Sequence, residues 1–354
     1  MGSCNCCKEK KDDNNIEIEK ELAETNHPTK YEEREPDISL LQPELASTHL
    51  THLQAQVRGF LSRRYFSSLP EPPPAPLESG LEELRALPPN LLSKEASAKH
   101  SSLGPYKFKE TPASKLKLRK PVRLPDGRIY VGTWDSSNYP SGNGTAYLPD
   151  GSIVEGQWVE GRLTGEGRRI TADGDVYVGG WANDTKQGKG RIEFRASGIT
   201  YDGEWANDMQ HGFGSESWPD GSNFKGNYVE GNKEGKGRYQ WADGSIYEGG
   251  FVNNQIEGFG VYSWSDGKVF EGGWKGNKMH GKGLFKWSDG RSYEGEYNMD
   301  QKEGFGVFVW PNGKRYEGMW RNGKQHGEGM LFNEKGKMRK GVWENGKIVR
   351  EPAK

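Results

Sequence analysis

One short phrase recurs every 23 residues along most of this chain, built on an aromatic residue, an acidic residue and a glycine. It reads Tyr-Glu-Gly-Gly-Phe from Tyr247, Phe-Glu-Gly-Gly-Trp from Phe270 and Tyr-Glu-Gly-Glu-Tyr from Tyr293. In the other copies the same position falls at Tyr130, Val154, Tyr177, Tyr201, Phe224, Tyr316 and Arg339. A fixed period of this length indicates stacked supersecondary units that need their neighbours to bury an apolar face. Such an array offers a long surface, so the pattern favours binding over catalysis.

Composition agrees with an array that lacks an ordinary globular core. Only 32% of the 354 residues are hydrophobic, 50 are glycines, and the mean hydropathy is −0.94. All 12 tryptophans lie within the repeats, so aromatic side chains must do most of the burying. The formal net charge of −1 gives no basic field for nucleic acid. No apolar run approaches the roughly 20 residues of a membrane span, and we expect no secretory signal.

Side-chain alternation predicts two short strands in each repeat. Residues two apart share one face of a strand. In the unit that begins at Phe270, charged residues alternate with an aromatic and glycine face that comprises Phe270, Gly272, Trp274, Gly281, Gly283, Phe285 and Trp287. Each repeat therefore reads as one half-buried pair of strands.

The phase of this alternation decides the turn between repeats. A two-residue loop would put the aromatic residues on opposite faces, because a one-residue slip flips every side chain. A three-residue loop over 288–290 instead pairs Phe285 with Tyr293 and Gly281 with Tyr297. Its last residue needs a left-handed backbone, which suits glycine; these glycines are Gly127, Gly151, Gly174, Gly221, Gly244, Gly267, Gly290 and Gly313. The other loop, 275–280, is predicted to be longer and polar, and Gly281 and Gly283 to make room for the ring of Tyr297.

The repeated unit resembles the MORN repeat (membrane occupation and recognition nexus). The resemblance rests on Tyr-Glu-Gly-x-Trp followed by a stretch such as 322–329, which reads Asn-Gly-Lys-Gln-His-Gly-Glu-Gly. It covers nine full units and a tenth half unit over residues 122–346. The whole chain is similar to MORN proteins of ciliated protists, which implies an elongated single-layer antiparallel β-meander that serves as a scaffold at membranes and cytoskeletal structures. Residues 347–354 would form a tail.

The aromatic positions of the repeats are expected to carry stability, and some of their rings are expected to be exposed for binding. They are Tyr130, Trp134, Trp158, Tyr177, Trp181, Tyr201, Trp205, Phe224, Tyr228, Tyr247, Phe251, Phe270, Trp274, Tyr293, Tyr297, Tyr316, Trp320 and Trp343.

Residues 1–30 are predicted to be a disordered, acylated tail. Gly2 follows the initiator methionine, which is where N-myristoylation occurs, although Cys6 stands where the motif asks for Ser or Thr. Cys4, Cys6 and Cys7 are candidate palmitoylation sites, and a second chain turns marginal membrane binding into stable anchoring. The alternatives are an unmodified cysteine-rich tail or a chance metal-binding Cys-x-Cys-Cys. The repeats hold no cysteine, which is typical of a cytosolic face.

Residues 44–68 are predicted to contain a basic amphipathic helix. Apolar residues at 50, 53, 57, 60 and 61 have helical spacing, beside three arginines. The stretch resembles the IQ motif at Leu53, Gln54, Arg58, Gly59, Arg63 and Phe66, with Phe60 as a further apolar anchor. The resemblance implies binding to a calmodulin-type EF-hand protein. The alternative is a helix that packs intramolecularly on the array.

Residues 69–121 are predicted to be a Pro-rich and basic linker. Pro72–Pro76 should be stiff and extended, and a short helical pattern over 81–87 ends at Pro88. A basic run over 109–123 could meet anionic lipid or be merely solvated.

No catalytic, metal or cofactor site is predicted. The Gly-x-Gly pairs lie within strands and do not open a helix, so they are not dinucleotide loops. His211, His280 and His326 share one repeat phase and are too far apart to bind one metal, so we expect solvated loop histidines.

Two functions follow from the sequence. The favoured one is a non-enzymatic, membrane-tethered scaffold at the cytoplasmic face of a membrane, at a cilium or the cell cortex. Its sheet would bind cytoskeletal or ciliary proteins or phospholipid, and its IQ helix a calmodulin-family protein. The alternative is a phosphoinositide-binding regulatory subunit that acts with a lipid kinase on another chain.

Overall fold

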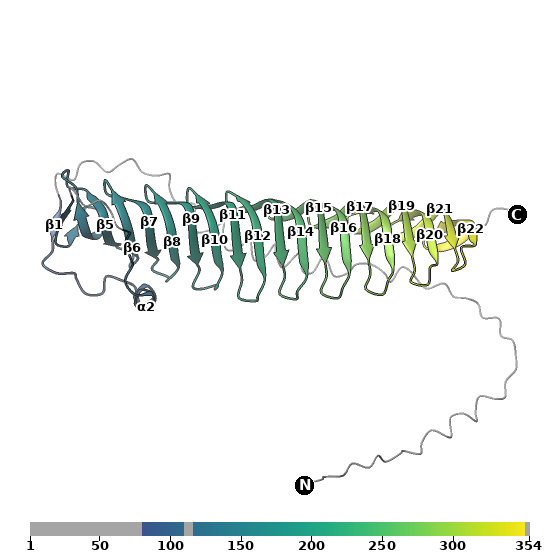
Figure 1. The fold of residues 1–354 in the computed structure, drawn as a ribbon, viewed down its shortest axis with the longest axis horizontal. Coiled ribbons are helices and arrows are strands. Elements are labelled where there is room, and N and C mark those ends of the chain that lie inside the picture. The colour runs from purple at the N-terminus through teal and green to yellow at the C-terminus, as the bar shows by residue number, and fades with distance from the viewer. Residues whose placement is uncertain (1–79, 110–115, 351–354) are drawn as a thin grey trace, which may run out of the picture. The chain divides into compact units, whose positions relative to one another are not determined.

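The repeats form one continuous antiparallel sheet. The computed structural model describes residues 80–109 and 116–350, and the strands β4–β23 in this part pair in chain order, side by side along the long axis of the array (Figure 1). This confirms the predicted β-meander. The strands are β4 (Ile129–Trp134), β5 (Pro140–Tyr147), β6 (Ile153–Val159), β7 (Arg162–Ile170), β8 (Val176–Ala182), β9 (Thr185–Glu193), β10 (Thr200–Ala206), β11 (Met209–Ser217), β12 (Asn223–Val229), β13 (Asn232–Gln240), β14 (Ile246–Val252), β15 (Gln255–Ser263), β16 (Val269–Lys275), β17 (Lys278–Lys286), β18 (Ser292–Asn298), β19 (Gln301–Val309), β20 (Arg315–Arg321), β21 (Lys324–Phe332), β22 (Met338–Glu344) and β23 (Lys347–Arg350).

Both ends of the sheet extend past the predicted limits. The N-terminal edge adds β1 (Glu82–Glu83), β2 (Lys117–Leu118) and β3 (Val122–Arg123); β2 and β3 both pair with β4, and β1 pairs with β3. The stretch predicted to be helical at 81–87 is therefore not a helix: Glu82 and Glu83 form the short edge strand β1, and the remaining residues are irregular. At the other end, β23 pairs with β22 inside the predicted tail.

A helix that the sequence analysis missed lies within the predicted linker. It is α2 (Lys94–Leu103), whose N-cap residue Ser93 accepts a hydrogen bond from the backbone of Ala96. Its pattern is weakly amphipathic, and only Ala96 in it is buried. Tertiary contact with the sheet, rather than its own periodicity, therefore holds it.

The three-residue turn between repeats has the predicted register. Phe285 lies opposite Tyr293, Gly283 opposite Gly295 and Gly281 opposite Tyr297. The turn closes through hydrogen bonds from Trp287 N to the Arg291 carbonyl (2.9 Å) and from Gly290 N to the Trp287 carbonyl (3.1 Å). All the predicted turn glycines have positive φ, between 82° and 90°. The period is 24 rather than 23 residues from Tyr130 to Val154 and from Tyr177 to Tyr201, and the loops between β4 and β5 and between β9 and β10 take up the extra residue.

The second turn of each repeat differs from the prediction. The range 275–280 is not a long polar loop: only Gly276 and Asn277 connect β16 to β17, and both have positive φ, as a type I′ turn requires. Met279, which was assigned to the loop, is fully buried in the strand. The Asn277 side chain also accepts a hydrogen bond from Ile256 N (2.7 Å), which links the turn to the preceding repeat.

The explanation predicted for the Gly-x-Gly pair is also wrong. Gly281 has a φ of +79° and an added Cβ would meet nothing, so it is needed for its backbone, beside the irregular register between β16 and β17. Gly283 is needed for space, but an added Cβ would overlap the ring of Phe270, in its own repeat, rather than Tyr297. The repeated phrase contains two aromatic positions, the first residue and the residue four positions later. Where the first aromatic is tyrosine, its hydroxyl donates a hydrogen bond to the backbone carbonyl three residues later, as from Tyr293 to Glu296 (3.1 Å). The ring thus lies along its own strand and covers the glycines.

The inner face of the sheet is an aromatic core. All 18 predicted aromatic positions are buried, none more than 6% exposed, so the expectation that some are open for binding is wrong. First and second aromatics meet edge to face, as Phe270 and Trp274 do with centroids 5.2 Å apart. The two strands of each repeat have an irregular register, as between β14 and β15, β16 and β17, and β18 and β19, and irregularities of this kind bend strands. We attribute the burial of rings in a single sheet to this bending and to the stacking of neighbouring repeats.

Candidate interaction surface

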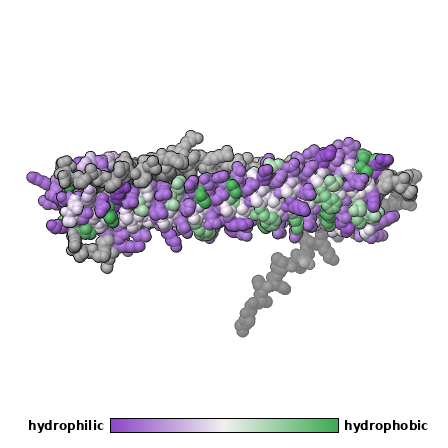
Figure 2. Space-filling model, turned by 90° about the horizontal axis from the view of Figure 1, so that it is seen from above, coloured by the Kyte–Doolittle hydropathy of each residue, from purple (hydrophilic) through white to green (hydrophobic). Residues whose placement is uncertain are grey.

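The outer face of the sheet carries the side chains that the rings leave free. Three phenylalanines occupy the central position of Gly-x-Gly in every second repeat, namely Phe213 (58% exposed), Phe259 (58%) and Phe305 (53%). Lys236 and Lys282 occupy the same position in the repeats between them and are exposed. Successive phenylalanines are four strand spacings apart, which corresponds to about 19 Å. In Figure 2 hydrophobic side chains form separate spots on a mostly hydrophilic surface.

A shallow groove lies between the first two of these phenylalanines. It has a volume of about 440 Å³, and Phe213 and Phe259 are among its lining residues. Lys225 and Lys236 also line it, are exposed, and make no ion pair among the described residues. Arg238, a further lining residue, pairs with Glu248 (2.9 Å). The groove therefore combines apolar walls with positive charge.

Further along the outer face, carboxylates alternate with apolar side chains in one cross-strand row. We call this row the acidic strip; it comprises Glu248, Val261, Glu271, Leu284, Glu294, Val307, Glu317 and Met330. Glu271 and Glu294 are exposed and have no ion-pair partner in the described ranges. Each has apolar residues directly opposite on both adjacent strands, and Lys282 and Lys286 stand on either side of Leu284 on the strand between them.

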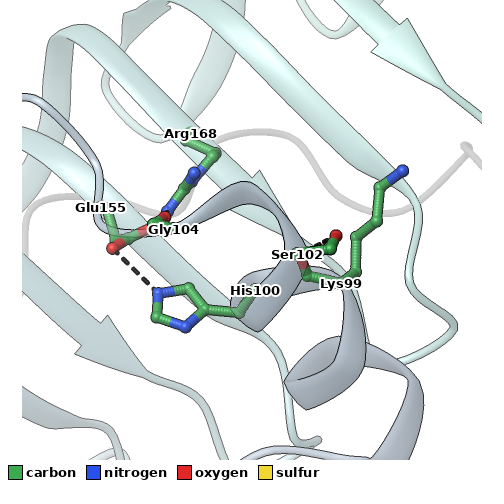
Figure 3. A network of polar contacts seen from close by, with 6 residues as sticks. All are labelled: Lys99, His100, Ser102, Gly104, Glu155 and Arg168. Atoms are coloured by element: carbon green, nitrogen blue, oxygen red, sulfur yellow. Dashed lines mark hydrogen bonds and ion pairs between the residues drawn. The ribbon is translucent and has the colours of Figure 1, made fainter.

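At the N-terminal end, the chain's own residues lie on the outer face. Ala96 of α2 packs with Ile153, Ile170 and Val176. Figure 3 shows the polar network beyond this contact: His100 faces Glu155 (3.3 Å), and Arg168 pairs with Glu155 (2.6 Å). Arg168 also donates to the carbonyl of Gly104 (2.9 Å).

This cover continues beyond the helix. Lys99 pairs with Glu193 on β9 (2.7 Å), and Lys109 lies 3.5 Å from Glu166 on β7. The ring of Tyr106 lies 5.6 Å from the guanidinium of Arg168. A short helix followed by an aromatic and basic stretch thus crosses the outer face over the first repeats.

The inner face contains buried lysines that sequence reasoning missed. They stand opposite the second aromatic in three repeats, at Lys186, Lys233 and Lys302. Lys233 pairs with the buried Glu216 (2.7 Å), which also accepts from the hydroxyl of Tyr228 (3.1 Å). The alternation of faces could have located this position, but it falls within the loop predicted over 275–280 and the equivalent stretches of the other repeats.

Rings lie near all three ammonium groups, but Lys302 differs from the other two because no carboxylate among the described residues pairs with it. Its ammonium lies 5.2–5.5 Å from four ring centroids, those of Trp287, Tyr293, Phe308 and Trp320. Burial lowers the pKa of Lys302 to about 8, with a smaller contribution from the positive charge of Arg291. The rings attract the cation but do not replace its hydration shell.

Other predicted site residues are not brought together or lie elsewhere. The lipidation residues (Gly2, Cys4, Cys6, Cys7) and the calmodulin-binding residues (Leu53, Gln54, Arg58, Gly59, Phe60, Arg63, Phe66) fall outside the described residues. His211, His280 and His326 lie in strands β11, β17 and β21, not in loops. In the described ranges, no cluster of His, Cys, Asp or Glu could hold a metal, and no helix is long and apolar enough to cross a membrane.

Comparison with solved structures gives weak likenesses. One is to the TCP10 domain of CPAP from Danio rerio, at 11% identity and a TM-score of 0.33, over 58% of this chain and 96% of that chain. Another is to the SAS-4 TCP domain of Drosophila melanogaster in complex with a proline-rich motif of Ana2, at 11% identity and a TM-score of 0.25, over 60% and 95% of the two chains. These scores are too low to indicate a shared function. No curated protein matches the chain.

The family model of the MORN repeat, in contrast, matches nine times in succession. The matches are residues 130–153, 155–176, 177–197, 201–223, 224–246, 247–269, 270–290, 293–315 and 316–337, which together make up more than half of the chain. They coincide with the hairpins of the sheet, from β4 to β21. The chain belongs to the MORN-repeat family.

Proposed function

We propose that the chain is a non-catalytic docking scaffold whose array presents its outer face to partner proteins. The observation that carries the proposal is the row of Phe213, Phe259 and Phe305, each more than half exposed at the same repeat position. A regular row of large exposed apolar side chains is a feature of interaction surfaces, whereas single ones are ordinary. The family is consistent with this, because MORN repeats occur in scaffold and membrane-binding proteins and are generally non-enzymatic.

The N-terminal predictions complete the proposed role. Acyl chains on Gly2 and on one of Cys4, Cys6 and Cys7 would hold the protein at a cytoplasmic leaflet. The IQ-like segment would bind a calmodulin-family protein through Leu53 and Phe60. The array would then dock cytoskeletal proteins at a ciliary or cortical structure.

The scaffold role is tested by removing the row without disturbing the core. The triple variant Phe213→Ser, Phe259→Ser and Phe305→Ser should lose the proteins that co-purify with the wild type from cells. A matched control carries the same change to serine at three exposed valines that precede the tight turns, Val159, Val229 and Val252. The control should keep the partners, and both variants should keep the wild-type melting temperature. If the phenylalanine variant keeps every partner, the row is not the docking surface.

The basic groove favours a second function. Lys225 and Lys236, exposed between Phe213 and Phe259, could take a phosphoinositide headgroup, as in a regulatory subunit for a lipid kinase on another chain. Protein made in bacteria, which lacks acyl chains, would be floated with neutral vesicles or with vesicles that contain phosphoinositide. Binding to the latter alone, lost in Lys225→Ser with Lys236→Ser, and stimulation of an added lipid kinase would favour this function. Equal recovery with both vesicles would exclude it.

A further inference from the structure

The outer face is already used once to hold the chain's own residues. Helix α2 and residues 104–109 lie on it through Ala96, His100, Tyr106 and Lys109, over strands β5–β9. From β11 onward Phe213, Phe259 and Phe305 stay exposed on the same face. The same surface therefore accepts a helix-containing segment at one end and is open at the other.

We propose that the acidic strip binds the chain's own segment 50–66. This segment carries Arg58, Arg63 and Arg64 and no acidic residue, and its apolar residues have helical spacing. The strip offers the complement: Glu271 and Glu294 are exposed without an ion-pair partner in the described ranges, and Val261, Leu284 and Phe259 lie beside them. Charges of opposite sign on both sides of an apolar contact select the partner and its orientation.

The connecting chain has the length to reach the strip. Gly80 lies against Pro125, in the turn just before β4. Five of the thirteen residues between Phe66 and Gly80 are prolines, Pro70, Pro72, Pro73, Pro74 and Pro76, and fourteen residue-to-residue steps separate the two. At about 3.1 Å per residue for a Pro-rich chain they span roughly 43 Å, and up to about 50 Å when fully extended. At about 4.8 Å per strand this places Phe66 over β13 or β14.

The segment itself matches the strip in length. The sixteen steps of a helix from residue 66 to residue 50 rise about 24 Å, which is about five strand spacings, so the segment would extend from about β13 to β18. Arg58 would then lie near Glu271 on β16, and Arg63 and Arg64 near Glu248 on β14, where they would share that carboxylate with Arg238. Phe213 on β11 falls outside this footprint, and Phe259 on β15 falls within it.

Limited trypsin digestion of the full chain tests the docking directly. Cleavage after Arg58, Arg63 and Arg64 should be at least tenfold slower than cleavage after Lys10 and Lys11 in the tail. Glu271→Lys with Glu294→Lys should raise cleavage of the segment to the tail's rate, and Phe259→Ser should raise it several-fold. The matched control is Phe213→Ser, which removes an equally exposed ring outside the footprint and should leave the protection unchanged.

Three outcomes would overturn the proposal. They are a wild-type segment that is cleaved as fast as the tail, protection that persists in both strip variants, and protection that falls on tenfold dilution, which would assign the contact to a second copy. The melting temperature of each variant shows that the array is intact. A peptide of residues 48–68 titrated with calmodulin tests the proposed function separately, because that result does not depend on the strip. If both hold, the strip variants should bind calmodulin more tightly than the wild type.

Discussion

Replacing Lys302 by methionine should stabilise the array near neutral pH. Methionine fits this position, because Met279 occupies it one repeat earlier and is fully buried. The pKa of Lys302 is about 8 in the folded chain against an ordinary value of 10.5. A difference of this size corresponds to about 3 kcal/mol of differential interaction between the protonation states. The four ring faces retain part of the ammonium's interaction energy, so we expect Lys302→Met to raise the free energy of unfolding by about 1–3 kcal/mol at pH 7.

The pH dependence follows from the direction of the shift. Because folding lowers the pKa of Lys302, the unfolded chain holds the proton more strongly between pH 8 and 10.5. The destabilisation is complete below pH 8 and is relieved as the pH rises through this window, so the advantage of the variant should shrink there. Burial raises the pKa of the array tyrosines, Tyr293 among them, so their contribution to stability is lost as pH rises above 10. Urea unfolding followed by tryptophan fluorescence should therefore be compared between pH 7 and pH 9.5.

Lys233→Met is the matched control, at the same position three repeats away. There the lysine neutralises the buried Glu216, so its removal leaves an uncompensated carboxylate and should cost about 3–5 kcal/mol. The two variants are expected to change stability in opposite directions. Destabilisation by Lys302→Met at pH 7, or a gain that does not change between pH 7 and 9.5, would refute the reasoning.

Three further predictions concern other parts of the chain. Gly283→Ala should destabilise the array more than Gly281→Ala in thermal unfolding. The first places a methyl group against a ring (about 1–3 kcal/mol or more), whereas the second only strains a left-handed backbone (about 1–2 kcal/mol). Gly281→Asn should be less destabilising than Gly281→Ala, and equal losses of stability would contradict the backbone explanation. Trp274→Ala should lower the free energy of unfolding by about 3–5 kcal/mol, and Trp343→Ala by clearly less. Both side chains are buried, but Trp274 contacts three rings and Trp343 one. Equal losses would contradict the view that each repeat is stabilised by its nearest neighbours. Gly2→Ala should release the protein to the soluble fraction of cells; a variant that stays membrane-bound would show that the anchor is not acyl.

The sequence alone determined the architecture, because the period and the alternation act together. The 23-residue spacing required identical stacked units, and the phase between Phe285 and Tyr293 left only one turn length that keeps all rings on one face. Gly290 and its equivalents then followed from backbone conformation. These inferences depend on geometry along the chain, which a single sequence contains.

Tertiary structure decided what the alternation could not show. The irregular register beside Gly281 breaks the period of two, so the pattern predicts a loop over 275–280, where Met279 is in fact buried, as is Lys302 at the same position of the next repeat. The same bending lets one sheet enclose its own rings, which closed the aromatic positions to partners and left Phe213, Phe259 and Phe305 as the exposed row. Helix α2 has little periodicity of its own and is held by contacts with distant residues, such as Glu155 and Glu193, which lie 55 and 94 positions from their partners in sequence. Contacts of this kind depend on how the sheet brings distant residues together, so no local pattern could have predicted them.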